Sequence, residues 1–324
     1  MPTYELTACI ACGSSDSTEL AGPEAMREEM EALWAFHERR LRPGAPPAPL
    51  ADRVAFSQHP PLRLARCTGC GLVYRNPIER TESLARAYAE TAPPHGTFQA
   101  LHATQRDAYR AQAKRLTRIV GRRGTGIEVG SYVAGFLAAA RDEGWRFTGV
   151  DVNADAVAFA RNLGFEARVG TIEDDEGRHA PVDVVAFWNC FDQLADPAQS
   201  LRAAVERLAP NGWIAIRVPN GAFYAALRPL LDSPFAWGAR LLLAHNNLLG
   251  FPYRFGFTPG SLGLLASRCG LQVRAVHGDT LVPIADRWTR PWAAVEERAV
   301  KRVLSLASRM GAGAPWFELY ARGE

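Results

Sequence analysis

Four of the chain's six cysteines stand in two copies of one short motif. Cys9 and Cys12 form the first C-x-x-C-G motif, and Cys67 and Cys70 form the second. Two thiolates on such a turn can bind one metal ion, and the following glycine permits the backbone conformation of the turn. A thioredoxin-like redox pair needs a strand before it and a helix after it, whereas glycine and turn or strand residues follow both copies here. We therefore predict one structural zinc site of four thiolates, with no open coordination position for a substrate.

A second group of residues has the spacing of a nucleotide-binding turn. Residues 126–131 read as a strand that ends at Gly130, and 136–143 read as the helix that follows. This order places backbone N–H groups and a helix N-terminus over a ligand. About 20 residues further on, the apolar segment 147–151 ends in Asp151, whose carboxylate can accept hydrogen bonds from both ribose hydroxyls. These features predict a mononucleotide site, although they would equally suit a dinucleotide dehydrogenase.

Two later segments separate these alternatives. Residues 165–169 read as a strand that leads to Ile172 and Glu173. The apolar Ile172 would contact the face of an adenine, and the acid Glu173 would accept a hydrogen bond from its exocyclic amine. Residues 182–187 read as the next strand and lead to the sequence W-N-C-F-D-Q-L-A-D-P. The chain thus contains, in order, E-V-G-S, an apolar residue followed by Asp, G-x-x-E, and D-V-V followed by D-Q-L-x-D-P. In these motifs, which cover residues 127–220, it resembles class I S-adenosylmethionine (SAM)-dependent methyltransferases.

The N-terminal cysteines extend this resemblance. The sequence R-C-T-G-C-G-L-V-Y-R-N-P at 66–77 is similar to the zinc module of a bacterial group that includes sugar C-methyltransferases. Between the two cysteine motifs, 23–41 reads as a charged helix, whose apolar stripe we expect to pack against the main domain rather than to bind a partner. A proline-rich stretch at 43–49 ends this helix, and short strands are expected at 62–67 and 72–74.

The resemblance implies a role for each residue of the cofactor site. The predicted cofactor-binding residues are Glu128 and Gly130 near the methionine part of SAM, Asp151 on the ribose, Ile172 and Glu173 at the adenine, Asn189 and Cys190 beside the sulfonium, and also Ser131, Tyr132 and Val152. Tyr132 and Ala134 occupy positions that often hold glycine, so their side chains narrow the space beside the methionine part. We expect binding to survive, with the nearby Gly135 offsetting this restriction.

The elements that position these residues follow from the hydrophobic pattern and from the resemblance. The predicted fold class is α/β, with a Rossmann-like seven-stranded sheet in the order 3-2-1-4-5-7-6, helices on both faces and a small N-terminal zinc ribbon. The sixth and seventh strands are expected at 272–276 and 316–320. We divide the chain into a zinc-ribbon module with a helical insertion at 1–92 and a methyltransferase domain at 93–324.

Two insertions are expected in the methyltransferase domain, a helical cap at about 221–257 and a helical insertion at about 285–312. The cap follows the fifth strand. Because ligands bind at the carboxyl ends of strands in open α/β sheets, we expect it to cover the methyl-transfer site and to govern the choice of substrate.

Methyl transfer needs a nucleophile in line with the activated methyl group and, for an oxygen or weakly acidic carbon acceptor, a base. The predicted catalytic residues are His245, Tyr253 and Asp192. His245 belongs to a polar cluster within the apolar cap, and it would equally suit a hydrogen-bonded structural histidine at a helix end. Gln193 can position a substrate but cannot act as a base.

Composition limits the class of partner. The 37 basic and 34 acidic residues are interspersed and leave a net charge of +3, which gives no strong field for nucleic acid or anionic lipid. The chain does not begin like a signal peptide, and polar residues interrupt the apolar stretch at 236–250. We therefore predict a cytoplasmic protein with no membrane partner, a small-molecule substrate, SAM as cofactor and structural zinc.

Three functions remain open at this stage. The favoured one is methyl transfer to a small-molecule acceptor, such as a nucleotide sugar, a polysaccharide precursor or a natural-product intermediate. The second is an RNA methyltransferase whose zinc module grips RNA, but the densest basic run near the module, residues 39–42, lacks interleaved aromatic residues. The third is a non-catalytic zinc-containing binding protein with a degenerate SAM site. The oligomeric state and the acceptor atom are not predicted.

Overall fold

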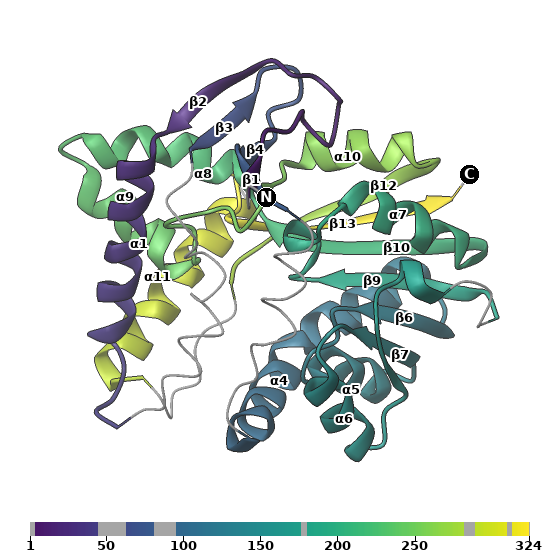
Figure 1. Ribbon diagram of the computed structural model, residues 1–324. Helices are drawn as coiled ribbons and strands as arrows, with labels where there is room; N and C mark the ends of the chain where they lie inside the picture. The colour runs from purple at the N-terminus through teal and green to yellow at the C-terminus, as the bar shows by residue number, and fades with distance from the viewer. Residues whose placement is uncertain are drawn as a thin grey trace. The chain divides into compact units, whose positions relative to one another are not determined.

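The computed structural model describes residues 4–44, 63–80, 95–175, 180–281, 289–309 and 313–323 (Figure 1). Its contacts divide the chain into two compact units. The first unit contains Met1–Ile78, Val218–Leu264 and Val276–Glu318, and the second contains Glu79–Arg217, Leu265–Ala275 and Leu319–Glu324. The N-terminal residues therefore share a unit with most of the predicted cap. The predicted domain boundary between residues 92 and 93 lies outside the described residues.

A seven-stranded sheet carries the motifs of the predicted cofactor site. Its strands are β6 (Thr125–Val129), β7 (Arg146–Asp151), β8 (Ala167–Val169), β9 (Val182–Trp188), β10 (Leu208–Pro219), β12 (Leu271–Asp279) and β13 (Trp316–Gly323). They lie in the order β12-β13-β10-β9-β6-β7-β8, which is the predicted order read from the opposite edge. Strand β6 pairs in parallel with β7 and β9, as do β7 with β8 and β9 with β10. The predicted α/β fold and strand order are confirmed.

The central strands are apolar because helices cover this part of the sheet. In β9 every residue except Asp183 is buried. The helices of the second unit are α4 (His95–Val120), α5 (Gly135–Asp142), α6 (Ala154–Asn162) and α7 (Pro197–Glu206). Figure 1 shows α5 and α6 beside β7, which both contact. Helix α7 begins where Asp196 accepts a hydrogen bond from the N–H of Gln199 at 2.9 Å and Pro197 takes the first helical position.

The N-terminal cysteine motifs belong to a small four-stranded sheet in the first unit. Its strands lie in the order β11-β4-β3-β2, with bounds β2 (Ser17–Ala21), β3 (Leu64–Cys67), β4 (Val73–Arg75) and β11 (Phe255–Gly256). Strands β3 and β4 correspond to the two that the sequence predicts. Strand β11 comes from the end of the predicted cap and pairs antiparallel with β4, with Phe255 opposite Tyr74. A separate pair is formed by β1 (Tyr4–Glu5) and β5 (Ile78–Glu79).

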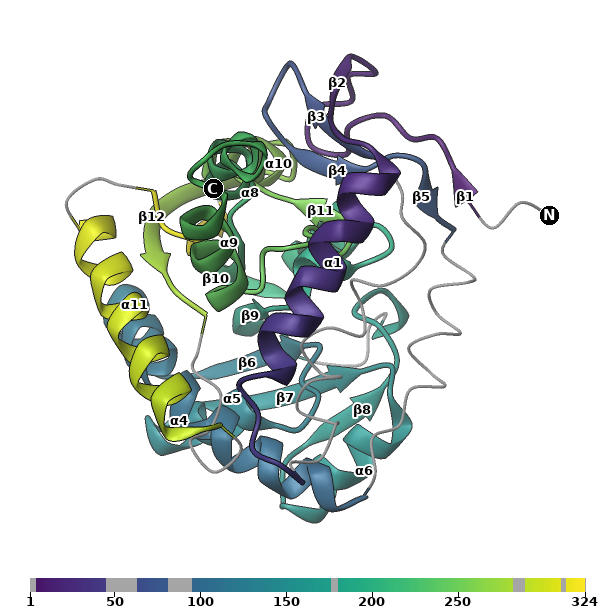
Figure 2. The ribbon, with the colours of Figure 1, turned by 90° about the vertical axis from the view of Figure 1, so that its left-hand side faces the viewer.

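Helix α1 (Pro23–Glu38) packs against the predicted cap, whose elements are α8 (Gly221–Leu227), η4 (Arg228–Asp232) and α9 (Ala236–His245). Met26, Leu33 and Phe36 share one buried cluster with Tyr224 and Leu243. Figure 2 shows α1 beside α9. The apolar stripe of this helix is therefore a packing surface, as its spacing predicts.

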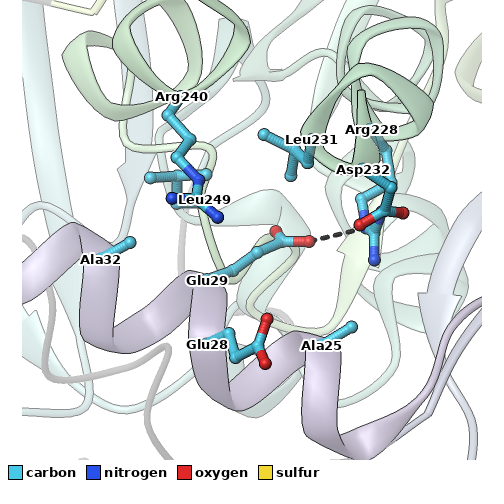
Figure 3. A pocket seen from close by; sticks show the side chains of 9 residues that line it. All are labelled: Ala25, Glu28, Glu29, Ala32, Arg228, Leu231, Asp232, Arg240 and Leu249. Carbon is cyan, nitrogen blue, oxygen red and sulfur yellow. Dashed lines mark hydrogen bonds and ion pairs between the residues drawn. The ribbon is translucent and has the colours of Figure 1, made fainter. Parts of the chain in front are cut away.

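One buried carboxylate fixes α1 to this core (Figure 3). Glu29 lies 2.7 Å from Nε of Arg228, accepts hydrogen bonds from the hydroxyl of Tyr224 at 2.9 and 3.1 Å, and accepts a third from the N–H of Gly250 at 3.1 Å. Arg228 also donates to Asp232 at 2.8 Å. Burial raises the pKa of Glu29, while its three partners act in the opposite direction. The charge of Glu29 is thus stabilised at a position that the sequence marks only as part of a helix.

The remaining elements are α10 (Pro259–Arg268), α11 (Pro291–Arg309) and the short 3-10 helices η2 (Glu173–Asp175) and η3 (Phe191–Gln193). Helix α11 lies within the predicted insertion at 285–312. Across the described ranges, no helix is both long enough and apolar enough to cross a membrane.

Candidate active site

The carboxylate of Asp151 joins the turn after β6 to the end of β7. Its Oδ2 accepts a hydrogen bond from the backbone N–H of Tyr132 at 2.8 Å, and its Oδ1 accepts one from the N–H of Asn153 at 2.9 Å. Burial raises the pKa of Asp151, and the two N–H donors oppose that shift. Because each carboxylate oxygen carries two lone pairs, both oxygens keep capacity to accept from a ligand's hydroxyl groups.

The turn after β6 adopts a glycine-like path although two of its residues are not glycine. Gly130, Tyr132 and Ala134 have φ angles of 70°, 41° and 57°. For the two non-glycine residues this conformation costs roughly 1–2 kcal/mol each. Gly135, the first residue of α5, has a different role, since a Cβ there would lie 2.4 Å from Cβ of Gln105 on α4. Gly135 therefore permits close packing of α4 on α5.

Glu128, near the end of β6, is buried, and one of its two carboxylate oxygens lacks a hydrogen-bond donor among the described residues. Its side chain is 2% exposed, and Oε2 accepts no hydrogen bond within the described part of the chain. Burial raises the pKa of Glu128 well above its ordinary value, and the negative charge of Asp151 adds to this shift. Ser131, in the same turn, has a buried hydroxyl with no hydrogen-bond partner among the described residues. The turn thus presents two unpaired polar atoms.

Cys190 lies against this turn. A Cβ added to Gly130 would lie 2.8 Å from Cβ and 2.9 Å from Sγ of Cys190, so the two residues approach too closely for any side chain at position 130. The thiol donates a hydrogen bond to the carbonyl of Val129 at 3.0 Å. Burial raises the pKa of Cys190 well above its ordinary value, and the charges of Asp192, Glu128 and Asp151 raise it further. Cys190 is therefore a neutral thiol and not a nucleophile.

Asn189 is held in place by three of its neighbours. Its Nδ2 donates to the hydroxyl of Tyr109 on α4 at 2.7 Å, and its Oδ1 accepts from Nη1 of Arg217 on β10. Its backbone carbonyl accepts from Nε2 of Gln193 at 2.9 Å. Arg217 is fully buried, and its role here was not predicted because an arginine within an apolar strand carries no motif. The three partners hold Asn189 in a left-handed conformation with φ of 62°.

Asp192, on η3, is a buried carboxylate that has no hydrogen-bond donor from a neighbouring described residue. It is 1% exposed, and neither of its carboxylate oxygens accepts a hydrogen bond from another described residue. Burial raises the pKa of Asp192 to about 7, while the charge of Arg217 acts in the opposite direction. This carboxyl group therefore titrates in the range where a general base works best.

Ile172 and Glu173 are the residues predicted at the adenine. Ile172 is 1% exposed, whereas Val152, predicted only as a cofactor-binding residue, is 42% exposed. Glu173, on η2, is half-buried, and its Oε1 accepts a hydrogen bond from the hydroxyl of Ser200 on α7 at 2.5 Å. Ser200 thus holds one oxygen of Glu173 and leaves the other for a donor.

The model of the methyltransferase domain family matches residues 101–276 of the chain, more than half of its length. The chain belongs to this family. It is therefore an enzyme that transfers methyl groups. No curated protein matches the chain.

Solved structures of other methyltransferases are similar to this one at low sequence identity. A SAM-dependent methyltransferase from Thermotoga maritima has 14% identity and a TM-score of 0.47, over 74% of this chain and 100% of that one. The plantazolicin methyltransferase BpumL in complex with SAH has 13% identity and a TM-score of 0.46, over 74% and 94%. A SAM-dependent methyltransferase from Archaeoglobus fulgidus has 15% identity and a TM-score of 0.43, over 67% and 94%.

The methyltransferase brings its four predicted metal ligands together. The sulfur atoms of Cys9, Cys12, Cys67 and Cys70 lie within 4.8 Å of one another. The Sγ atoms of Cys9 and Cys70 lie 3.4 Å apart, and so do the Sγ atoms of Cys12 and Cys67. Both distances are far longer than the roughly 2 Å of a disulfide bond. Four sulfur atoms bound to one zinc ion at about 2.3 Å lie just under 4 Å apart. This arrangement therefore fits a four-thiolate zinc site.

Two of the predicted catalytic residues lie in the first unit, whereas Asp192 lies in the second. His245 ends α9, and its Nε2 lies 3.0 Å from Oε1 of Glu296 on α11. Glu296 is also an ion-pair partner of Arg40, which is 1% exposed. Burial, followed by the charge of Arg40, lowers the pKa of His245 to about 4. His245 is therefore neutral at pH 7.

Tyr253 follows α9 in the same unit of the methyltransferase. Its hydroxyl accepts a hydrogen bond from Nδ2 of Asn247 at 2.9 Å. Asn246, the neighbour of Asn247, serves the backbone instead: its Nδ2 donates to the carbonyl of Leu242 at 2.9 Å, and its carbonyl accepts from Nε1 of Trp316 at 2.9 Å. The amides of this polar cluster thus hold the chain that carries His245 and Tyr253.

Proposed function

We propose that this enzyme uses SAM to methylate a small-molecule acceptor. The observation that carries the proposal is the position of Asp151, held at the end of β7 by the N–H groups of Tyr132 and Asn153 at 2.8 and 2.9 Å. A carboxylate fixed in this way, with lone pairs to spare, suits the two hydroxyls of a ribose. Asp151 would thus place the adenosine part of SAM over the turn after β6.

The unpaired polar atoms around this turn fit the rest of the cofactor. Oε2 of Glu128 and Oγ of Ser131 are buried without hydrogen-bond partners in the described structure. The methionine part of a bound SAM would supply a partner for each of them. The free oxygen of Glu173 would accept from the exocyclic amine of the adenine, beside Ile172. The remaining residues proposed to bind SAM are Gly130, Tyr132, Val152, Asn189 and Cys190.

When bound, SAM would supply a methyl group activated by a positively charged sulfur. This chain's own residues would orient the acceptor and remove a proton from it. Asp192 is the residue that we propose as the base, because its pKa of about 7 suits proton removal at neutral pH. We also propose His245 and Tyr253 as residues that contact the acceptor. His245 has a pKa of about 4, so it would be a weaker base than Asp192 at neutral pH.

The acceptor class that we favour is a nucleotide sugar, a polysaccharide precursor or a natural-product intermediate. The basic run near the cysteine motifs offers little to RNA, because Arg40 is buried in ion pairs with Glu296 and Glu297 and Arg42 donates to the carbonyl of Thr289 at 2.8 Å. A protein that grips RNA would keep such side chains at its surface.

We propose zinc as the ion held by the four cysteine sulfurs, with a structural role. With this module we assign the chain to the bacterial methyltransferase group that includes sugar C-methyltransferases, with the module at 1–92 and the methyltransferase domain at 93–324. None of the six cysteines forms a disulfide bond, in keeping with the reducing, cytoplasmic location that we propose.

The cofactor proposal is tested by isothermal titration calorimetry with S-adenosylhomocysteine (SAH). We expect binding to the unmodified protein, and at least tenfold weaker binding to the Asp151→Asn variant because one acceptor oxygen is lost. Asp142→Asn, which changes an exposed acid on α5, is the matched control and should bind SAH normally. If millimolar SAH gives no heat with the unmodified protein, the proposal is wrong.

A further inference from the structure

Three carboxylates act electrostatically on the same buried position. Asp192, Glu128 and Asp151 all disfavour a negative charge on Cys190, which lies against the turn after β6. The field that disfavours a thiolate at this position favours a cation beside it. Asp192, Glu128 and Asp151 lie on three different elements, η3, β6 and β7 respectively.

Two of these carboxylates are buried without the donors that such groups normally have. Asp192 is 1% exposed with neither oxygen paired, and Glu128 is 2% exposed with Oε2 unpaired, as far as the described residues show. Leaving a buried charged acceptor unpaired is costly, so proteins rarely keep such groups unless a ligand or an ion completes them. A positively charged ligand beside Cys190 would compensate both.

Positive charge from the protein itself compensates Asp192 only in part. Arg217 on β10 is the cation that acts on Asp192, and its Nη1 is engaged by Oδ1 of Asn189. The charged groups that act on Cys190 or Asp192 thus include the three carboxylates and the guanidinium of Arg217. Burial raises the pKa of all three acids, and a cation beside them would favour their ionised forms.

We propose that Asp192, together with Glu128, makes this site prefer the sulfonium cation of SAM over the neutral sulfur of SAH. The inference rests on the proposed use of SAM. In methyl transfer the acceptor's electron pair forms the new bond to the methyl carbon, the electron pair of the carbon–sulfur bond stays on sulfur, and the acceptor's proton goes to a base. Sulfur thereby loses its positive charge, and with it the attraction to Asp192 and Glu128. The product is then released more readily than the substrate.

The preference is measured as the ratio of two dissociation constants, that of SAH divided by that of SAM, by isothermal titration calorimetry without any acceptor. We expect the ratio to fall about tenfold in Asp192→Asn, which removes the charge and keeps the shape. Glu128→Gln should lower the ratio in the same direction. Glu173→Gln is the matched control: it should weaken both ligands equally, since both carry the same adenine, and leave the ratio unchanged.

The pH dependence gives a second measurement that needs no variant. Because Asp192 gains its charge near pH 7, the preference for SAM should rise between pH 6 and pH 8 in the unmodified protein. The rise should be smaller in Asp192→Asn, in which only Glu128 and the ligands' own groups titrate.

The outcomes separate this inference from the proposed function. If both ligands bind and the ratio is the same in Asp192→Asn and the unmodified protein, the inference is overturned while the cofactor proposal stands. A ratio that does not change with pH in the unmodified protein overturns it as well, even if Asp192→Asn fails to fold. If neither SAM nor SAH binds the unmodified protein, the proposed function fails, and the inference that rests on it fails too.

Discussion

The backbone N–H of Tyr132 donates a hydrogen bond to Oδ2 of Asp151 at 2.8 Å. This bond links the turn after β6 to the end of β7, and it forms with Tyr132 at a φ of 41°. Tyr132 occupies a position that often holds glycine, yet the turn keeps this hydrogen bond. The donor is a backbone N–H, which tyrosine supplies as glycine would.

Replacing Asp151 by Asn should destabilise the protein. The carboxylate accepts from two backbone N–H groups, one on each oxygen, and the amide nitrogen of Asn cannot accept from either. One N–H is then left unpaired, which lowers the free energy of unfolding by about 1–3 kcal/mol. Urea denaturation measures the change. Asp142→Asn, at an exposed ion pair with Arg106, should change the same quantity by less than about 1 kcal/mol, and an equal loss in both variants would contradict the assignment.

The sheet could be predicted from the sequence because its strands carry strong local signals. The run at 182–187 is apolar throughout except for Asp183, as expected of a strand covered on both faces, and β9 spans Val182–Trp188. Asp151 ends its strand as the spacing from Gly130 requires. The cysteine pairs were equally predictable, since both motifs place two thiols on one turn.

Other features depend on contacts between residues distant in the sequence. Strand β11 pairs Phe255 with Tyr74, and Glu29 meets Arg228, across gaps that no local period spans. Arg217 reads as an interruption in an apolar strand, yet it is fully buried and bound to Asn189. Such buried charges become intelligible only with their partners in place, because isolated charges are not expected in a core.

The titration of Asp192 should make stability depend on pH. Its pKa rises from 3.8 to about 7 on folding because the group is buried, so the folded state binds the proton more tightly. Proton binding by Asp192 therefore adds to the free energy of unfolding below pH 4. This contribution, on the order of a few kcal/mol, is lost as the pH rises towards 7. The Asp192→Asn variant carries no buried charge at this position, so its free energy of unfolding should exceed that of the unmodified protein at pH 8, and by a smaller amount at pH 5. Chemical denaturation at the two pH values measures both differences. Equal differences would disprove the raised pKa of Asp192.

The four clustered cysteines should hold about one zinc ion per chain. Cys12→Ser and Cys67→Ser each remove one thiolate from the cluster, so bound zinc and the melting temperature should fall together. Metal content is measured by mass spectrometry after dialysis. Cys269→Ser changes a cysteine outside the cluster and should retain the metal. Equal zinc in all three variants would show that the metal lies elsewhere.

Glu29→Gln should be among the most destabilising single changes in the first unit. The substitution removes the charge that faces Arg228 at 2.7 Å and one of the oxygens that bind Tyr224 and Gly250. Breaking a buried pair on one side costs about 3–5 kcal/mol. Thermal and urea denaturation measure the effect. Glu28→Gln is a close control, since Glu28 precedes Glu29 on α1 but is exposed (Figure 3), and it should change stability by less than about 0.5 kcal/mol.

His245 provides an opposite dependence on pH. Its pKa falls from 6.5 to about 4 on folding, through burial and the charge of Arg40, so the unfolded state binds the proton more tightly. The stabilising contribution of His245 is about 2–4 kcal/mol above pH 6.5, and it is lost as the pH falls towards 4. His245→Gln cannot take up this proton. Relative to the unmodified protein, the variant should therefore gain stability as pH is lowered from 7 to 4.5, measured by urea denaturation at both values. A stability difference that does not change with pH would mean that folding leaves the pKa of His245 unshifted, which would contradict its burial as a neutral group.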